Sequence, residues 1–167
     1  ALITPVVVGF IFGAEVLGFP TNLQKGNTMK VCPNCQQQFV APDWTCTVCS
    51  HIPSRLHGYL TLAPDLAEGG AGFRPDIFEQ LAALEAENFW FRARNRLIVW
   101  ALKQNFKTIE KYLEIGCGTG YFLSGVAQAF PEARLVGSEV FSIGLPYAAS
   151  RAKTAELIQM DARKIPY

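Results

Sequence analysis

Four cysteines in two pairs are the residues with the clearest chemistry in this chain of 167 residues. Cys32 and Cys35 form one CxxC motif, and Cys46 and Cys49 form a second after ten intervening residues. Each motif makes a tight turn that directs two thiolates to one point, and two such turns complete a tetrahedral sulfur site that favours zinc. The spacing predicts a structural zinc ribbon. Disulfides are the alternative, but the spacing favours a metal in a reducing, cytoplasmic compartment.

A glycine-rich segment, Gly116-Cys117-Gly118-Thr119-Gly120, follows a short apolar run and precedes a helical pattern. Glycines let the backbone turn sharply and approach a ligand without an intervening Cβ atom. In a doubly wound sheet, a cofactor binds at this position. The GxGxxG pattern of dinucleotide-binding proteins would need glycine at position 121, which is Tyr121. The pattern is instead GxGxG, with Glu114 two residues before it, and a tight turn without a ligand is the alternative.

The run from Leu113 to Gly120 closely resembles motif I of class I S-adenosylmethionine-dependent methyltransferases. The resemblance covers roughly residues 85–167 and includes an aromatic and arginine-rich segment, Phe89 to Arg94, ahead of the motif. It implies S-adenosylmethionine as the cofactor and direct transfer of its methyl group to an oxygen, nitrogen or carbon atom. It identifies no catalytic base in this chain.

The resemblance also implies cofactor contacts outside the loop. Glu139 matches the acid that holds both ribose hydroxyls, and its two acceptor oxygens suit a vicinal diol. Val140 matches the apolar neighbour of the adenine, and Asp161 with Ala162 matches the pair that reads the adenine amino group. A solvated strand end at Glu139 and a turn acid at Asp161 are the competing interpretations. The expected cofactor residues are Glu114, Gly116, Cys117, Gly118, Gly120, Glu139, Val140, Asp161, Ala162 and Arg94.

Arg94 belongs to this set because a guanidinium group matches a carboxylate fork such as the methionine end of the cofactor. An ordinary surface arginine is the alternative. Cys117 belongs to it for its small size and not as a nucleophile. The aromatic neighbours Trp90 and Phe91 are expected to pack against helices rather than to touch the cofactor.

Strands that alternate with helices of about ten residues predict βαβ units and a parallel sheet. The expected strands lie at 112–115, 135–138 and 157–160, with helices over 121–130 and 143–151. The predicted fold class is α/β: an incomplete Rossmann-like sheet, comprising the first three βα units, preceded by a helical segment and a small zinc ribbon. A complete fold of this class has seven strands, so we expect the chain to be truncated at its C-terminus.

The chain divides into segments of different composition. They are an apolar leader (1–28), the zinc ribbon (29–58), a linker rich in glycine and proline (59–75), a helical segment (76–108) and the first half of the cofactor-binding domain (109–167). We interpret the leader as translated upstream sequence, because Met29 stands directly before the ribbon. The alternative is an apolar segment that packs or spans a membrane. The leader lacks the basic start of a signal peptide, and no membrane association is expected unless it is genuine.

Charge limits the expected partners. The chain has 15 basic and 14 acidic residues and a net charge of +1. Proteins that bind nucleic acid on their own are usually more basic, because phosphate contacts supply most of the affinity. We therefore expect a small-molecule acceptor in preference to RNA. An RNA-modifying methyltransferase that uses the zinc ribbon as a clamp and a non-catalytic zinc-binding interaction protein are the alternatives. The oligomeric state is not indicated.

Overall fold

The computed structural model describes residues 6–8, 28–69, 74 and 76–167. The strands are β1 (Val6–Val8), β2 (Met29–Val31), β3 (Gln38–Val40), β4 (Arg55–Leu56), β5 (Tyr59–Thr61), β6 (Lys111–Ile115), β7 (Arg134–Glu139) and β8 (Glu156–Gln159). The helices are α1 (Ile77–Leu84), α2 (Phe89–Asn105), α3 (Tyr121–Ala129) and α4 (Leu145–Arg151), with 3-10 turns η1 (Pro64–Leu66) and η2 (Ser142–Gly144).

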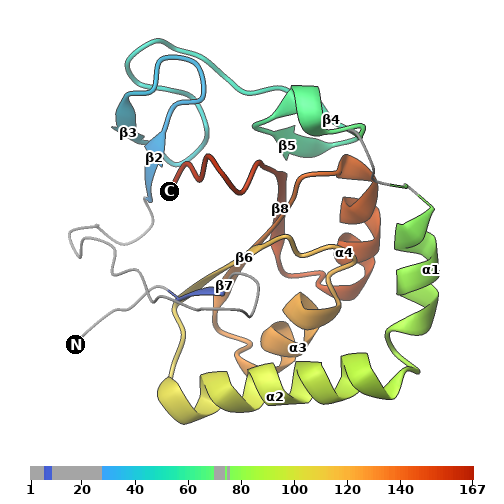
Figure 1. Ribbon diagram of the computed structural model, residues 1–167. Helices are drawn as coiled ribbons and strands as arrows, with labels where there is room; N and C mark the ends of the chain where they lie inside the picture. Colours follow the sequence, from blue (N-terminus) through green and yellow to red (C-terminus); the bar gives the residue numbers. More distant parts are fainter. Residues whose placement is uncertain (1–5, 9–27, 70–73, 75) are drawn as a thin grey trace.

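The main sheet has the order β1-β6-β7-β8-β5-β4 (Figure 1). Its centre is the expected parallel set, in which Tyr112 of β6 pairs with Leu135 of β7 and Ser138 of β7 pairs with Ile158 of β8. Helix α3 connects β6 to β7, and α4 connects β7 to β8. The predicted α/β fold class with a partial Rossmann-like sheet is therefore confirmed, although the third strand, β8, is followed by no helix in the described residues.

The two faces of the sheet are covered by different layers. Successive side chains of a strand point to opposite faces. Leu135 and Leu157 belong to a core that includes buried residues of α2, α3 and α4. Their neighbours Val136 and Ile158 pack instead against residues 29–58, the expected zinc ribbon, which contains β2 and β3 and is called the cysteine module below. The cysteine module therefore covers the face opposite the helices (Figure 1).

The first residues of the expected linker (59–75) form a strand and are not part of an irregular connection. Residues 59–61 form β5, which pairs in parallel with β8 and places Leu60 opposite Ile158. Leu60 is buried in the same cluster as Cys32. The glycines and prolines that suggested a linker begin only at Pro64, and three strand residues are too few to show a period in the sequence. Residues 70–73 and 75 of this segment lie outside the described residues.

Strand β1 lies at one edge of the sheet, where sequence reasoning placed no strand. It pairs in parallel with β6, with Val7 opposite Leu113. Residues 1–5 and 9–27 of the expected leader lie outside the described residues. The interpretation of this leader as translated upstream sequence stays a prediction.

The expected helical segment is divided into α1 and α2, and Asn88 stands directly before α2. The Asn88 side chain accepts a hydrogen bond of 2.9 Å from the backbone N–H of Trp90. An N-cap of this kind satisfies one of the free amides at a helix start. In the part of the chain that the structure describes, no helix combines the length and apolar character needed to cross a membrane.

Candidate functional site

The glycine loop joins β6 to α3, and its three glycines, Gly116, Gly118 and Gly120, all adopt left-handed φ values that favour glycine. Gly120 starts α3 with a φ of 74°, and a Cβ atom there would lie 2.6 Å from the Cα of Ala148 in α4. Gly118 has a φ of 54°, and no described atom lies within 4 Å of where its Cβ would be. The loop therefore packs tightly on α4 at Gly120 and presents an open side at Gly118.

Glu139, at the end of β7, holds this loop through its carboxylate. Its Oε2 accepts a hydrogen bond of 3.0 Å from the N–H of Gly118. Its Oε1 accepts from the N–H groups of Val140 at 2.8 Å and Phe141 at 3.2 Å. These contacts use three of roughly four acceptor positions on a carboxylate. The acid expected to hold the ribose is thus brought directly against the expected cofactor loop.

Burial raises the pKa of Glu139, and hydrogen bonds from Phe141, Gly118 and Val140 act in the opposite direction. The residue as a whole is 8% exposed, so its carboxylate is well shielded from water. In such surroundings a hydrogen bond to the ionised form is worth more than in water. Further donors from a ligand would therefore bind strongly here.

Glu114, on β6, is a buried carboxylate whose negative charge is only partly balanced by hydrogen bonds and nearby positive charge. Within the described residues, no donor reaches its buried Oε2. Burial raises the pKa of Glu114 to about 8, and the Tyr112 side chain and the Arg94 charge oppose this only in part. A buried carboxylate with one oxygen left without a donor is costly, and a cationic ligand would relieve that cost.

Arg94 and its neighbour Asn95 connect α2 to the start of α3. The Arg94 guanidinium lies over the Phe122 ring, 5.0 Å from its centroid. The Asn95 side chain donates a hydrogen bond of 3.1 Å to the carbonyl of Tyr121. Arg94 is therefore half-buried beside the first turn after the glycine loop, and its charge acts on Glu114.

The other expected cofactor residues take different positions. Cys117 is buried in the helix-side core, where it lies beside Gly137, so its thiol serves packing. Val140 is half-buried next to Glu139, whereas Gly116 and Ala162 are exposed. Gly116 and Cys117 therefore lie in the loop and Val140 lies beside Glu139, whereas Ala162 lies beyond β8.

Asp161 lies just after β8 and near Glu139, but its carboxylate is hydrogen-bonded to Arg163. The N–H of Met160 donates to the carbonyl of Glu139 at 3.1 Å. The Asp161 carboxylate accepts hydrogen bonds from the guanidinium and the backbone N–H of Arg163. These hydrogen bonds hold the pKa of Asp161 below its usual value.

A buried polar cluster behind the loop was not predicted. Arg151 of α4 donates to the Thr119 hydroxyl at 2.6 Å and to the carbonyl of Ala82 at 2.6 Å. It also forms an ion pair with Glu85, to which the Thr119 hydroxyl donates as well. The Arg151 guanidinium lies over the ring of Tyr121. The cluster ties the end of α1 and the end of α4 to the glycine loop, across sequence separations that no local pattern reveals.

The four cysteine sulfurs have the spacing of a tetrahedral metal site. The Sγ atoms of Cys32 and Cys49 are 3.7 Å apart, and those of Cys35 and Cys46 are 3.8 Å apart. All four lie within 4.8 Å of one another. A zinc ion about 2.3 Å from each sulfur would set them about 3.8 Å apart. The donor set therefore fits zinc.

The backbone supports this site in the same way at both CxxC turns. Gln36 and Ser50, each directly after the second cysteine, adopt left-handed φ values of 60° and 58°. Their N–H groups donate to the carbonyls of Cys32 and Cys46. A backbone hydrogen bond from His51 lowers the pKa of the Cys49 thiol to about 6, which favours the metal-binding thiolate.

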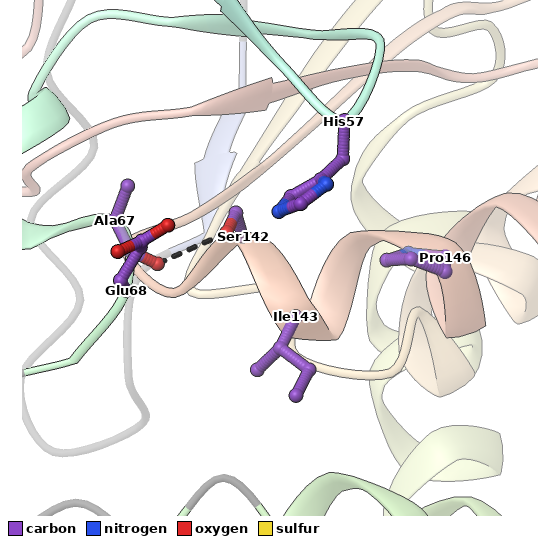
Figure 2. Close-up of a pocket in the computed structure, with 6 residues that line it drawn as sticks. All are labelled: His57, Ala67, Glu68, Ser142, Ile143 and Pro146. Carbon is purple, nitrogen blue, oxygen red and sulfur yellow. Dashed lines mark hydrogen bonds between the residues drawn. The ribbon is translucent and has the colours of Figure 1, made fainter.

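A cavity of about 430 Å³ lies beside η2, next to the strand that carries Glu139 (Figure 2). Its lining residues are His57, Ala67, Glu68, Ser142, Ile143 and Pro146. The Ser142 hydroxyl donates to the carbonyl of Ala67 at 3.0 Å, which holds the segment after η1 against η2. None of the expected cofactor residues lines this cavity.

Comparisons with known proteins bear on the segment that contains the loop. Residues 109–162 match a family described as "Putative methyltransferase". A stretch of 49 residues is 43% identical to a tRNA (guanine-N(7)-)-methyltransferase of Halalkalibacterium halodurans. This match covers 29% of the chain and 22% of that relative. The resemblance to class I S-adenosylmethionine-dependent methyltransferases is confirmed.

The expected preference for a small-molecule acceptor over RNA is wrong. The named relative is a tRNA methyltransferase, which points to an RNA acceptor. The expectation came from a net charge of +1, and that sum does not describe how charges are distributed over the surface.

Proposed function

We propose that this protein binds S-adenosylmethionine at the loop between β6 and α3 and transfers the methyl group to RNA. The observation that carries the cofactor assignment is the buried Oε2 of Glu114, which has no donor among the described residues. S-adenosylmethionine carries a positive ammonium group and a positive sulfur. Either charge would compensate a carboxylate that burial otherwise disfavours.

Glu139 and Gly118 support the same assignment. The Glu139 carboxylate is preformed by three backbone donors and retains acceptor capacity for a ribose hydroxyl. Gly118 leaves open space on the side where a Cβ atom would project. Together with Val140, these residues are proposed to hold the nucleoside end of the cofactor.

The residues of this chain would act by binding and orientation. When bound, S-adenosylmethionine would supply an electrophilic methyl group on a positively charged sulfur, with a neutral thioether as the leaving group. Fixing donor and acceptor in line supplies much of the rate enhancement in such a transfer. Arg94, half-buried beside α3, is proposed to pair with the carboxylate of the cofactor.

The RNA acceptor is proposed from the tRNA methyltransferase to which the chain is similar. The cysteine module is a poor clamp for RNA. Its Lys30 is buried, with the ammonium group donating to the carbonyls of Ala41 and Asp43. We propose instead that zinc folds this module, and that the protein works in a reducing, cytoplasmic compartment where its thiols stay available.

Transfer of radiolabelled methyl from S-adenosylmethionine to tRNA tests the proposed function. We expect incorporation by the wild-type protein and loss of at least about tenfold in the Glu139→Ala variant at limiting cofactor. Cofactor binding without methyl transfer to any RNA would favour a non-catalytic zinc-binding interaction protein instead. NADH serves as the control ligand and should not bind, because Tyr121 replaces the glycine of its fingerprint.

A further inference from the structure

The outward side of α2 carries positive charge along its length. Arg92, Arg96 and Lys103 are exposed, and spacings of four and seven residues put them on one line along the helix. Helix α2 contains no acidic residue, and the nearest acids along the chain are Glu87 before it and Glu110 after it. The chain as a whole has a net charge of only +1, so this line concentrates cations on one surface.

These three cations have no partners inside the described part of the protein. Among residues 6–8, 28–69, 74 and 76–167, none of their side chains enters an ion pair or a hydrogen bond. Arginine and lysine groups in this state can neutralise phosphates at little cost, because no internal interaction must be broken.

Aromatic side chains lie beside this line of cations. Phe89, three residues before Arg92, is 79% exposed, and Trp100, four residues after Arg96, is 59% exposed. Large apolar groups gathered on one exposed surface mark a site of interaction. Aromatic rings next to arginines are the usual means by which proteins stack the unpaired bases of RNA.

The opposite side of α2 contacts the helix that follows the glycine loop. Asn95 hydrogen-bonds the carbonyl of Tyr121, and Arg94 lies over the ring of Phe122. A macromolecule held on the outer side of α2 is therefore anchored by the same helix that borders the candidate cofactor site.

We propose that the outer face of α2, defined by Phe89, Arg92, Arg96, Trp100 and Lys103, binds RNA through phosphates at the cations and unpaired bases on the rings of Phe89 and Trp100. This inference rests on the proposed function and names the surface that it uses. The charge favours RNA over a second copy of the chain, because a symmetric contact at this face would bring like charges together.

Binding of an unmodified tRNA transcript, measured by fluorescence anisotropy over a range of salt concentrations, tests this surface. Arg92→Gln combined with Arg96→Gln should weaken binding by about tenfold or more. The slope of log K against log salt should become shallower by about 1.4, which is about 0.7 for each phosphate that the variant no longer neutralises. The control, Arg55→Gln with Lys153→Gln, removes the same charge from exposed positions elsewhere and should change both quantities far less.

A second variant tests the stacking interaction separately. Trp100→Ala should weaken tRNA binding by roughly tenfold, whereas Trp100→Phe should retain most of the affinity because it keeps an aromatic ring. Binding to a fully paired RNA duplex of the same length should not respond to Trp100→Ala. This comparison separates loss of stacking from a general defect in folding.

Each outcome has a distinct meaning. Equal tRNA binding by wild type and the Arg92/Arg96 variant would overturn this surface and leave the proposed methyl transfer standing. Binding that depends on α2 without methyl transfer to tRNA would uphold the surface and overturn the proposed activity. The surface is also overturned if the wild type binds no tRNA, or if Trp100→Ala only converts a dimer to a monomer.

Discussion

The ring of Trp44 in the cysteine module meets the ring of Tyr167 edge-on, with centroids 5.6 Å apart and planes at 74°. Beside this contact, the N–H of Val31 donates a hydrogen bond of 2.8 Å to the carbonyl of Pro166. Both contacts join the module to the segment that follows β8. The cysteine turns therefore stabilise the sheet as well as their own fold. Loss of the metal should destabilise both the cysteine module and the segment that follows β8.

Zinc removal gives the first prediction. The purified protein should contain about one zinc per chain, because the four sulfurs fit one tetrahedral ion. Chelation should raise hydrogen exchange across residues 29–58 and also across β8 and Tyr167, which pack on the module. Cys46→Ser should lose the metal, whereas Cys117→Ser should retain it because Cys117 lies in the other core. A zinc-free wild type with unchanged exchange after chelation would refute the metal site.

The pair of Arg151 and Glu85 gives the second prediction. Both side chains are largely buried, with 19% and 8% exposure, so removal of one leaves the other charge without a partner. Arg151→Met should therefore lower the free energy of unfolding by about 3 kcal/mol. Adding Glu85→Gln should recover part of this loss, which a double-mutant cycle in urea would measure. Strictly additive losses would mean that the two groups do not stabilise the glycine loop together.

Glu114 gives the third prediction, which concerns pH. Its pKa of about 8 in the folded protein lies above the ordinary value of 4.5, so the folded state binds more protons than the unfolded state between these values. Stability should fall as pH rises from about 4.5 to about 8 and should level off above that. Glu114→Gln should remove this fall and add up to about 3 kcal/mol at pH 7.

The same substitution separates stability from ligand binding. Glu114→Gln should weaken S-adenosylmethionine binding even as it stabilises the protein, because the amide cannot supply the negative charge that the cofactor requires. Urea unfolding at several pH values and calorimetry measure the two effects. A Glu114→Gln variant that is both less stable and equally tight in cofactor binding would contradict the assigned role.

The sequence predicted the features that are local and left out those that are distant. The CxxC turns and the glycine loop could be identified because neighbouring residues specify each of them. The pairing of Leu60 with Ile158 and the ion pair of Glu85 with Arg151 join residues far apart in the chain, with no pattern to connect them. Trp90 was expected to pack against helices, yet it is 59% exposed, since helical spacing alone does not fix which side meets the core.

Calorimetric titration of S-adenosylmethionine into the wild type, Glu139→Ala and a matched control, Glu110→Ala, tests the proposed cofactor site. Glu110 is an exposed acid just before β6, so its loss should leave affinity unchanged. Charge-assisted hydrogen bonds are worth about 1.5–3 kcal/mol each, so Glu139→Ala should weaken binding by at least about tenfold. Equal affinity in all three proteins, or tight binding of NADH with none of S-adenosylmethionine, would rule out the proposed cofactor site at Glu139.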